Sequence, residues 1–112
     1  MANTRRLRVV YDVSMVLFEG FELLDVFGPV ELLARLPEEY RIIYVAPDTG
    51  PVRSSQGAEI VVPVSLKDAA HSDIVFMPGG PGTRCLVRDQ QFLQMLSHVA
   101  APASIVVSVC TG

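Results

Sequence analysis

The chain has 112 residues, half of them hydrophobic, and a formal net charge of −3. This length suits one domain or part of one, and the apolar content is enough for a buried core, which excludes an intrinsically disordered chain. Arg5, Arg6 and Arg8 form the largest basic cluster, which is too small for a nucleic-acid-binding surface. We therefore expect no nucleic-acid partner, and we interpret residues 1–8 as a flexible tail.

Cysteine usage and hydropathy bear on the compartment. The two cysteines, Cys85 and Cys110, do not make a disulfide framework. No early apolar run has the character of a signal peptide, since Asp12 and Glu19 interrupt the first one, and no run approaches membrane-spanning length. We expect a cytoplasmic protein with free thiols and no membrane partner.

The first half of the chain predicts two strands and one helix. Val13–Phe18 predicts a strand, Phe21–Asp25 a connection, and Gly28-Pro29 the opening of a helix, because proline is tolerated in a first turn. Tyr40–Ala46 predicts the second strand. The apolar face of the predicted helix comprises Val26, Val30, Leu32, Leu33 and Leu36.

Short elements are predicted in the middle of the chain. After the turn residues 47–51, Val52–Ser55 and Glu59–Val64 predict short strands around Gln56-Gly57. Ser65 is a candidate cap for a helical turn that runs through Ala70.

The last third predicts a strand, a helix and a final strand. Ser72–Met77 runs into the loop Pro78–Gly82, and Asp89 is a candidate cap for the next helix, which Ala101-Pro102 ends. Ser104–Val109 is typical of a buried parallel strand. Alternating strands and helices predict a layered α/β fold with a mainly parallel sheet, whose ligands bind beyond the carboxyl ends of the strands. The predicted apolar face of the second helix comprises Phe92, Leu93, Leu96 and Val99.

Cys110 is the most reactive candidate. It stands at the predicted carboxyl end of the last strand and is followed by Thr111, whose amide is a candidate donor. A thiolate in such a turn can act as a nucleophile, whereas a buried cysteine more commonly only packs. The local pattern supports both readings equally. Cys85 lacks a comparable context, and we interpret it as incidental.

Two further segments are candidates for the same edge of the sheet. The glycines of residues 78–82 let backbone amides approach a ligand or an oxyanion, although such a loop can also be a plain connection. Asp25 could cap the helix or exchange a proton with a thiol, and Glu19 competes with it for that acid role. His71 and His98 do not predict a Cys–His pair, and no grouping has metal-ligand spacing, so we expect no metal or cofactor.

Three motifs in one order carry a family resemblance. They are residues 16–29, residues 77–84 and Val107–Gly112, and together they resemble the ThiJ/PfpI (DJ-one/PfpI) family of the class I glutamine-amidotransferase-like superfamily, with the isonitrile hydratase-like branch nearest. The resemblance implies a flavodoxin-like three-layer α/β sandwich with a mainly parallel sheet. It also implies a small-molecule substrate and a homodimer or other self-association.

The resemblance assigns roles to named residues. It implies that Cys110 is the nucleophile, that Asp25 interacts with its thiol, that the amides of Gly80 and Thr111 bind substrate or oxyanion, and that Gly79 supports their loop. Protease-like members carry His directly after the nucleophile, so Thr111 disfavours a peptidase. The implied reaction is thiolate attack on an isonitrile carbon, followed by addition of water to give an N-substituted formamide.

The chain is shorter than the domains of the family it resembles. Family domains continue beyond the nucleophile, so we expect residues 1–112 to be the N-terminal part of a single ThiJ/PfpI-like domain, truncated and with weak or absent activity. The alternative function is a ligand- or redox-sensing domain, as in AraC-type transcriptional regulators with a ThiJ/PfpI-like N-terminal domain.

Overall fold

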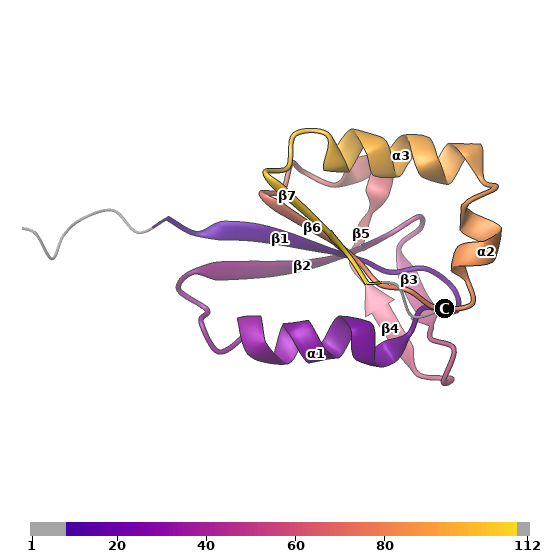
Figure 1. The fold of residues 1–112 in the computed structure, drawn as a ribbon, viewed down its shortest axis with the longest axis horizontal. Helices are drawn as coiled ribbons and strands as arrows, with labels where there is room; N and C mark the ends of the chain where they lie inside the picture. Colours follow the sequence, from indigo (N-terminus) through magenta and orange to yellow (C-terminus); the bar gives the residue numbers. More distant parts are fainter. Residues whose placement is uncertain (1–8, 110–112) are drawn as a thin grey trace, which may run out of the picture.

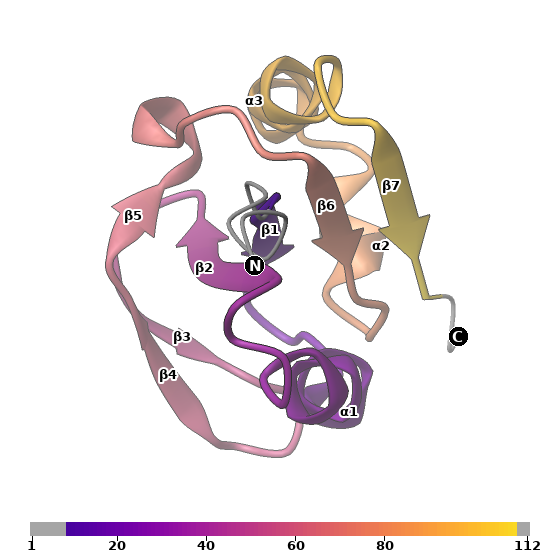
Figure 2. The same cartoon turned by 90° about the vertical axis from the view of Figure 1, so that its left-hand side faces the viewer.

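A parallel sheet organises the chain. The computed structural model describes residues 9–109, in which five strands pair in the order β5-β2-β1-β6-β7, every neighbouring pair parallel. Figure 2 shows this order across the sheet. The strands are β1 (Tyr11–Val16), β2 (Tyr40–Ala46), β5 (Val64–Ser65), β6 (Ile74–Met77) and β7 (Ile105–Ser108).

Helices cover both faces of this sheet. Helix α1 (Leu23–Leu33) lies against one face and α3 (Gln90–Ala100) against the other, which makes three layers (Figure 1). A short helix, α2 (Thr83–Leu86), precedes α3, and a 3₁₀ turn, η2 (Leu66–Asp68), follows β5. The predicted flavodoxin-like α/β sandwich is confirmed. Within residues 9–109 no helix has the length and apolar character needed to cross a membrane.

The two faces of the sheet have separate apolar cores because side chains alternate along each strand. On β1, Val13 and Met15 pack in the core on the α1 side, whereas Val16 packs with Phe92 and Val99 of α3. All five side chains are almost fully buried. This two-sided burial explains why the central strands read as continuous apolar runs.

Helix α1 begins earlier than the sequence predicts. The expected connection Phe21–Asp25 and the helix opening at Gly28-Pro29 are wrong, since the helix starts at Leu23 and Pro29 lies inside it. The free amide of Leu23 donates to Oε1 of Gln56, 33 residues away, at 3.1 Å. A distant side chain thus satisfies a first-turn N–H, which no local pattern could indicate. Leu32 and Leu36, predicted on the apolar face, are exposed.

The middle segment separates into a hairpin and a sheet strand. β3 (Gly50–Arg53) and β4 (Glu59–Val62) form an antiparallel pair outside the main sheet. The chain then enters β5 after Pro63, which has no amide to donate to a ladder. The predicted strands therefore exist, but the second one ends at Val62. Ser65 caps the following turn as predicted, accepting a bond from the amide of Asp68.

The last third has the predicted order of strand, helix and strand, although β6 begins at Ile74 rather than Ser72 and Leu93, predicted on the apolar face of the helix, is exposed. Asp89 caps α3 through a 3.1 Å bond from the amide of Phe92, as predicted. β7 pairs in parallel with β6, yet Ile105 and Val106 are 52% and 57% exposed. The expectation of a buried strand is wrong here because, among residues 9–109, β7 has a neighbouring strand on one side only. The predicted tail, residues 1–8, lies outside the described residues.

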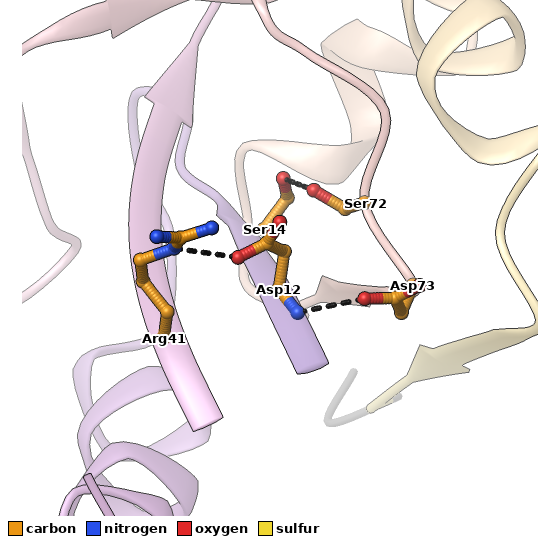
Figure 3. A network of polar contacts seen from close by, with 5 residues as sticks. All are labelled: Asp12, Ser14, Arg41, Ser72 and Asp73. Atoms are coloured by element: carbon orange, nitrogen blue, oxygen red, sulfur yellow. Dashed lines mark hydrogen bonds and ion pairs between the residues drawn. The ribbon is translucent and has the colours of Figure 1, made fainter. Parts of the chain in front are cut away.

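Polar side chains join the amino-terminal ends of three strands (Figure 3). Oδ1 of Asp12 accepts a 2.7 Å bond from Nε of Arg41 on β2, and Oδ2 of Asp73 accepts a 2.8 Å bond from the Asp12 amide. The hydrogen bond and the charge of Asp12 raise the pKa of Arg41. Ser14 and Ser72, both buried, bond to each other through their hydroxyls. This network holds β2, β1 and the start of β6 in register.

The serine pair generates a stability prediction. Ser14→Ala leaves the buried Ser72 hydroxyl without its partner, so unfolding free energy should fall by about 1–3 kcal/mol. Adding Ser72→Ala removes that orphaned group, and the double variant should be no less stable than Ser14→Ala. Urea unfolding of the two single variants and the double variant measures this; additive losses would contradict the pairing.

Candidate functional site

The candidate site lies at the carboxyl edge of the sheet, beyond the ends of β1 and β6. The connection after β1 leads to α1 on one face, and the connection after β6 leads to α2 and α3 on the other (Figure 1). Neighbouring parallel strands whose connections leave in opposite directions create the usual ligand site of such folds. Two loops line it here, the β1 loop (residues 17–22) and the β6 loop (residues 78–82).

The two loops cross with their backbones in contact. A Cβ on Gly82 would lie 1.9 Å from the carbonyl oxygen of Glu19, and one on Gly80 would lie 2.5 Å from that of Gly20. Gly80 also has φ of +128°, a conformation that side chains disfavour. The amide of Gly82 donates to the Gly20 oxygen at 3.3 Å. Glycine is required in the β6 loop because backbone, rather than side chains, fills the crossing.

Gly79 is held from two sides by the β1 loop and α1. Its amide donates to Oδ2 of Asp25 at 3.1 Å, and its carbonyl accepts from the amide of Glu22 at 2.9 Å. Gly79 is buried and Asp25 is half-buried. The structure therefore brings together Asp25 and Gly79, which are 54 residues apart in the chain.

The orientation of the Gly80 amide follows from this arrangement. The Gly79–Gly80 peptide is trans, so the N–H of Gly80 points opposite to the carbonyl of Gly79. That carbonyl faces Glu22, so the N–H is directed away from the β1 loop. Within residues 9–109 this N–H has no hydrogen-bond acceptor. It is a fixed donor at the carboxyl edge of the sheet.

The last strand, β7, ends at the same edge of the sheet. β7 runs parallel to β6, and the amide of Val109 donates to the carbonyl of Met77 at 3.0 Å, directly before the β6 loop. Cys110 and Thr111, the predicted nucleophile and its neighbouring amide, lie outside the described residues.

The structure shows what Glu19, the competing candidate for the acid role, contacts, and whether Asp25 caps the helix. Glu19 is exposed, and its Oε2 accepts a 2.9 Å bond from the amide of Arg53, so it fastens β3 to the β1 loop. Asp25 is not the helix cap, because α1 begins two residues earlier and its N-cap is Glu22. The Asp25 carboxylate instead bonds the amide of Gly79.

The remaining candidates lie elsewhere. Cys85 is an exposed free thiol in α2. The rings of His71 and His98 lie near each other, with centroids 6.2 Å apart, His71 shortly before β6 and His98 in the last turn of α3. Among residues 9–109, no three His, Cys, Asp or Glu side chains are grouped to hold a metal ion.

Sequence reasoning missed Gln56 and Glu22. Gln56 bridges the hairpin turn to the start of α1, donating from Nε2 to Oε2 of Glu22 at 2.8 Å and accepting from the Leu23 amide. The only sequence signal for the Gln56 contact is that no neighbouring side chain caps the helix at Leu23. A more distant group must then accept from the Leu23 amide.

The fold and this edge define the class: a flavodoxin-like α/β protein with a candidate site between β1 and β6. A family model described as "DJ-1/PfpI family" matches residues 11–112. The chain therefore belongs to the DJ-1/PfpI family, as its resemblance to ThiJ/PfpI proteins predicted.

For each of the following relatives, the match covers a larger share of this chain than of the relative. It is 36% identical over 100 residues to isonitrile hydratase of Pseudomonas putida, covering 89% of this chain and 43% of that protein. It is 31% identical over 74 residues to the glutathione-independent glyoxalase DJR-1.2 of Caenorhabditis elegans, covering 64% of this chain and 40% of that one. A ThiJ/PfpI family protein from Pseudomonas syringae superposes with a TM-score of 0.84 at 25% identity, covering 100% and 48%. The chain thus spans a little under half the length of these three relatives.

The loop crossing generates a matched pair of glycine predictions. Gly82→Ala must push Glu19 away, so unfolding free energy should fall by about 1–3 kcal/mol. Gly28→Ala is the control: its Cβ would meet only a side-chain atom of Leu24, at 3.9 Å, and alanine favours a helix interior by up to about 1 kcal/mol. Urea unfolding should show opposite signs, and equal effects would contradict the crossing.

The carboxylate bond generates a second prediction. Asp25→Ala removes a charge-assisted bond to the Gly79 amide and should lower unfolding free energy by about 1.5–3 kcal/mol. Asp25→Asn keeps an acceptor oxygen and should lose less. The control is Glu31→Ala, which breaks only an exposed pair with Arg35 and should cost at most about 0.5 kcal/mol. Chemical unfolding of the three variants checks this order, and an Asp25→Ala loss no larger than the control's would contradict it.

Proposed function

We propose that this chain carries a cysteine-dependent hydratase or hydrolase site for a small molecule, most like that of isonitrile hydratase. The observation that carries the proposal is the bond from the Gly79 amide to Oδ2 of Asp25, at the edge where β7 leads toward Cys110. The similarity to isonitrile hydratase of Pseudomonas putida supports the choice of reaction.

The proposed reaction begins at sulfur. The Asp25 carboxylate takes the proton of the Cys110 thiol, the thiolate forms a bond to the terminal carbon of an isonitrile, and Asp25 returns that proton to the carbon, giving a thioimidate. Water then adds to the same carbon, and Asp25 takes one proton from the water and passes it to the nitrogen. As the carbon–sulfur bond breaks, the hydroxyl proton passes through Asp25 to the leaving thiolate, and an N-substituted formamide is released. The sum is one isonitrile plus one water.

Backbone amides complete the proposed site. The oxygen that water brings acquires negative charge as the carbonyl forms, and preorganised N–H donors stabilise such charge. Gly80 offers one N–H whose direction the Gly79 carbonyl determines, and we assign the second donor to Thr111. Gly79 supports this arrangement by bonding both Asp25 and Glu22. The role of Asp25 requires only that its second oxygen reach the thiol or the substrate.

Replacement of the thiol tests the proposal. Cys110→Ser should lower the rate of formamide production from a small alkyl isonitrile by about a thousandfold or more, because the nucleophile is lost. Cys85→Ser is the matched control, and since Cys85 is exposed on α2 it should retain the wild-type rate. Formamide is quantified by chromatography against an enzyme-free blank.

Two results would contradict the proposed hydratase reaction. Formamide production that survives in Cys110→Ser would rule out the thiolate mechanism. Wild-type protein that leaves the isonitrile unchanged but consumes glyoxal in a Cys110-dependent way would replace the hydratase reaction with the one named for the nematode relative.

A further inference from the structure

The β3–β4 hairpin is fastened to residues 19–22 of the β1 loop. The amide of Gly20 donates to the Arg53 carbonyl at 2.8 Å, and the amide of Ser55 donates to the Phe21 carbonyl at 2.9 Å. Phe21 and Ser54 also form an isolated parallel bridge. Phe21 is fully buried, so this junction is anchored in the α1-side core. The hairpin turn thereby lies against the segment that leads into α1.

Gln56 extends this junction from the loop to the helix. Its side-chain amide uses both ends, accepting from the Leu23 amide at 3.1 Å and donating to the Glu22 carboxylate at 2.8 Å. Glu22 is the N-cap residue of α1 but makes no side-chain cap bond of its own. Gln56 therefore supplies the capping contact that the helix lacks, and it orients the Glu22 residue at the same time.

A short chain of bonds runs from Gln56 to the candidate site. The backbone amide of Glu22 donates to the Gly79 carbonyl, and Asp25, on the first turn that Gln56 caps, accepts from the Gly79 amide. Asp25 holds the Pro78–Gly79 peptide through its N–H, and Glu22 holds the Gly79–Gly80 peptide through its carbonyl; both residues belong to the segment that Gln56 fastens. The Gly80 N–H lies in the Gly79–Gly80 peptide plane, so its direction depends on the Glu22 contact.

We propose that Gln56 is a positioning residue, which sets the placement of Asp25 and of the Gly80 N–H through Glu22 and the start of α1. This inference rests on the proposed function of that site. Gln56 is exposed and stands on a hairpin turn, so its role is exerted through these contacts rather than by touching the substrate.

Three substitutions on the hairpin turn test the role. Gln56→Met keeps the side-chain length but removes both polar contacts. Gln56→Glu keeps an acceptor for the Leu23 amide but sets a carboxylate beside that of Glu22. Ser55→Ala is the matched control, because the Ser55 backbone bond to Phe21 remains. Both substituted positions are exposed, and urea unfolding verifies that each variant is folded.

Two readouts are measured on each variant. Amide resonances of Gly79 and Gly80 are followed in a ¹⁵N-correlated spectrum, and kcat and KM are measured for the small alkyl isonitrile. Gln56→Met should shift both resonances and lower kcat by about three- to tenfold with KM within about twofold, the size expected for one or two lost hydrogen bonds. Gln56→Glu should lower kcat more at low than at high salt, because exposed charges are screened. Ser55→Ala should match wild type.

The outcomes separate this inference from the proposed function. Unmoved Gly79 and Gly80 resonances in Gln56→Met would overturn the positioning role, as would an unchanged kcat beside shifted resonances, or a Ser55→Ala variant that behaves like Gln56→Met. If wild-type protein shows no isonitrile turnover, the proposed function fails, and the two resonances alone then decide whether Gln56 positions the loop.

Discussion

Gly79 is the residue on which the candidate site depends. Its N–H and its carbonyl are both engaged by the segment that starts α1, through the carboxylate of Asp25 and the backbone of Glu22. This double attachment joins the ends of β1 and β6, the two strands whose connections diverge to opposite faces. It is possible only because Gly80 and Gly82 lack side chains, since any Cβ there would collide with the backbone of the β1 loop. Loop crossing, helix start and amide direction are therefore one coupled arrangement.

The β3–β4 hairpin supports this coupled arrangement. It pairs with no strand of the main sheet, yet Val52 and Val62 are buried in the core under α1. Its turn bonds the β1 loop through backbone groups and reaches α1 through Gln56. A core-anchored support behind the β6 loop is what a preorganised donor needs, because an amide that must reorganise during reaction stabilises charge poorly. The opposite edge of the sheet is held separately, by Asp12, Arg41 and the serine pair.

The candidate site lies beyond central strands of the sheet rather than beyond its edge strands. The chain spans 43% of the Pseudomonas putida relative and 48% of the Pseudomonas syringae one, and β7 is an exposed edge strand within residues 9–109. Even so, strands β1 and β6 are paired with neighbours on both sides, and the loops after them are held by contacts internal to this chain. The positions of Asp25, Gly79 and Gly80 rest on these local and hairpin contacts.

The sequence by itself determined the layered α/β fold, the second strand, the capped start of α3 and the family. The strands and the helix start follow from periodicity and from local caps such as Asp89, which depend on residues close together in the chain, whereas the family follows from the order of three motifs within residues 16–112. It also singled out Asp25 and Gly79, although it did not establish their bond. Only the tertiary structure decided where α1 begins, that Glu19 serves the hairpin, that Ile105 is exposed, and that Gln56 completes the helix start. Each of these depends on hydrogen bonds or neighbours tens of residues distant, and a pattern of local side chains carries no information about which remote group will arrive.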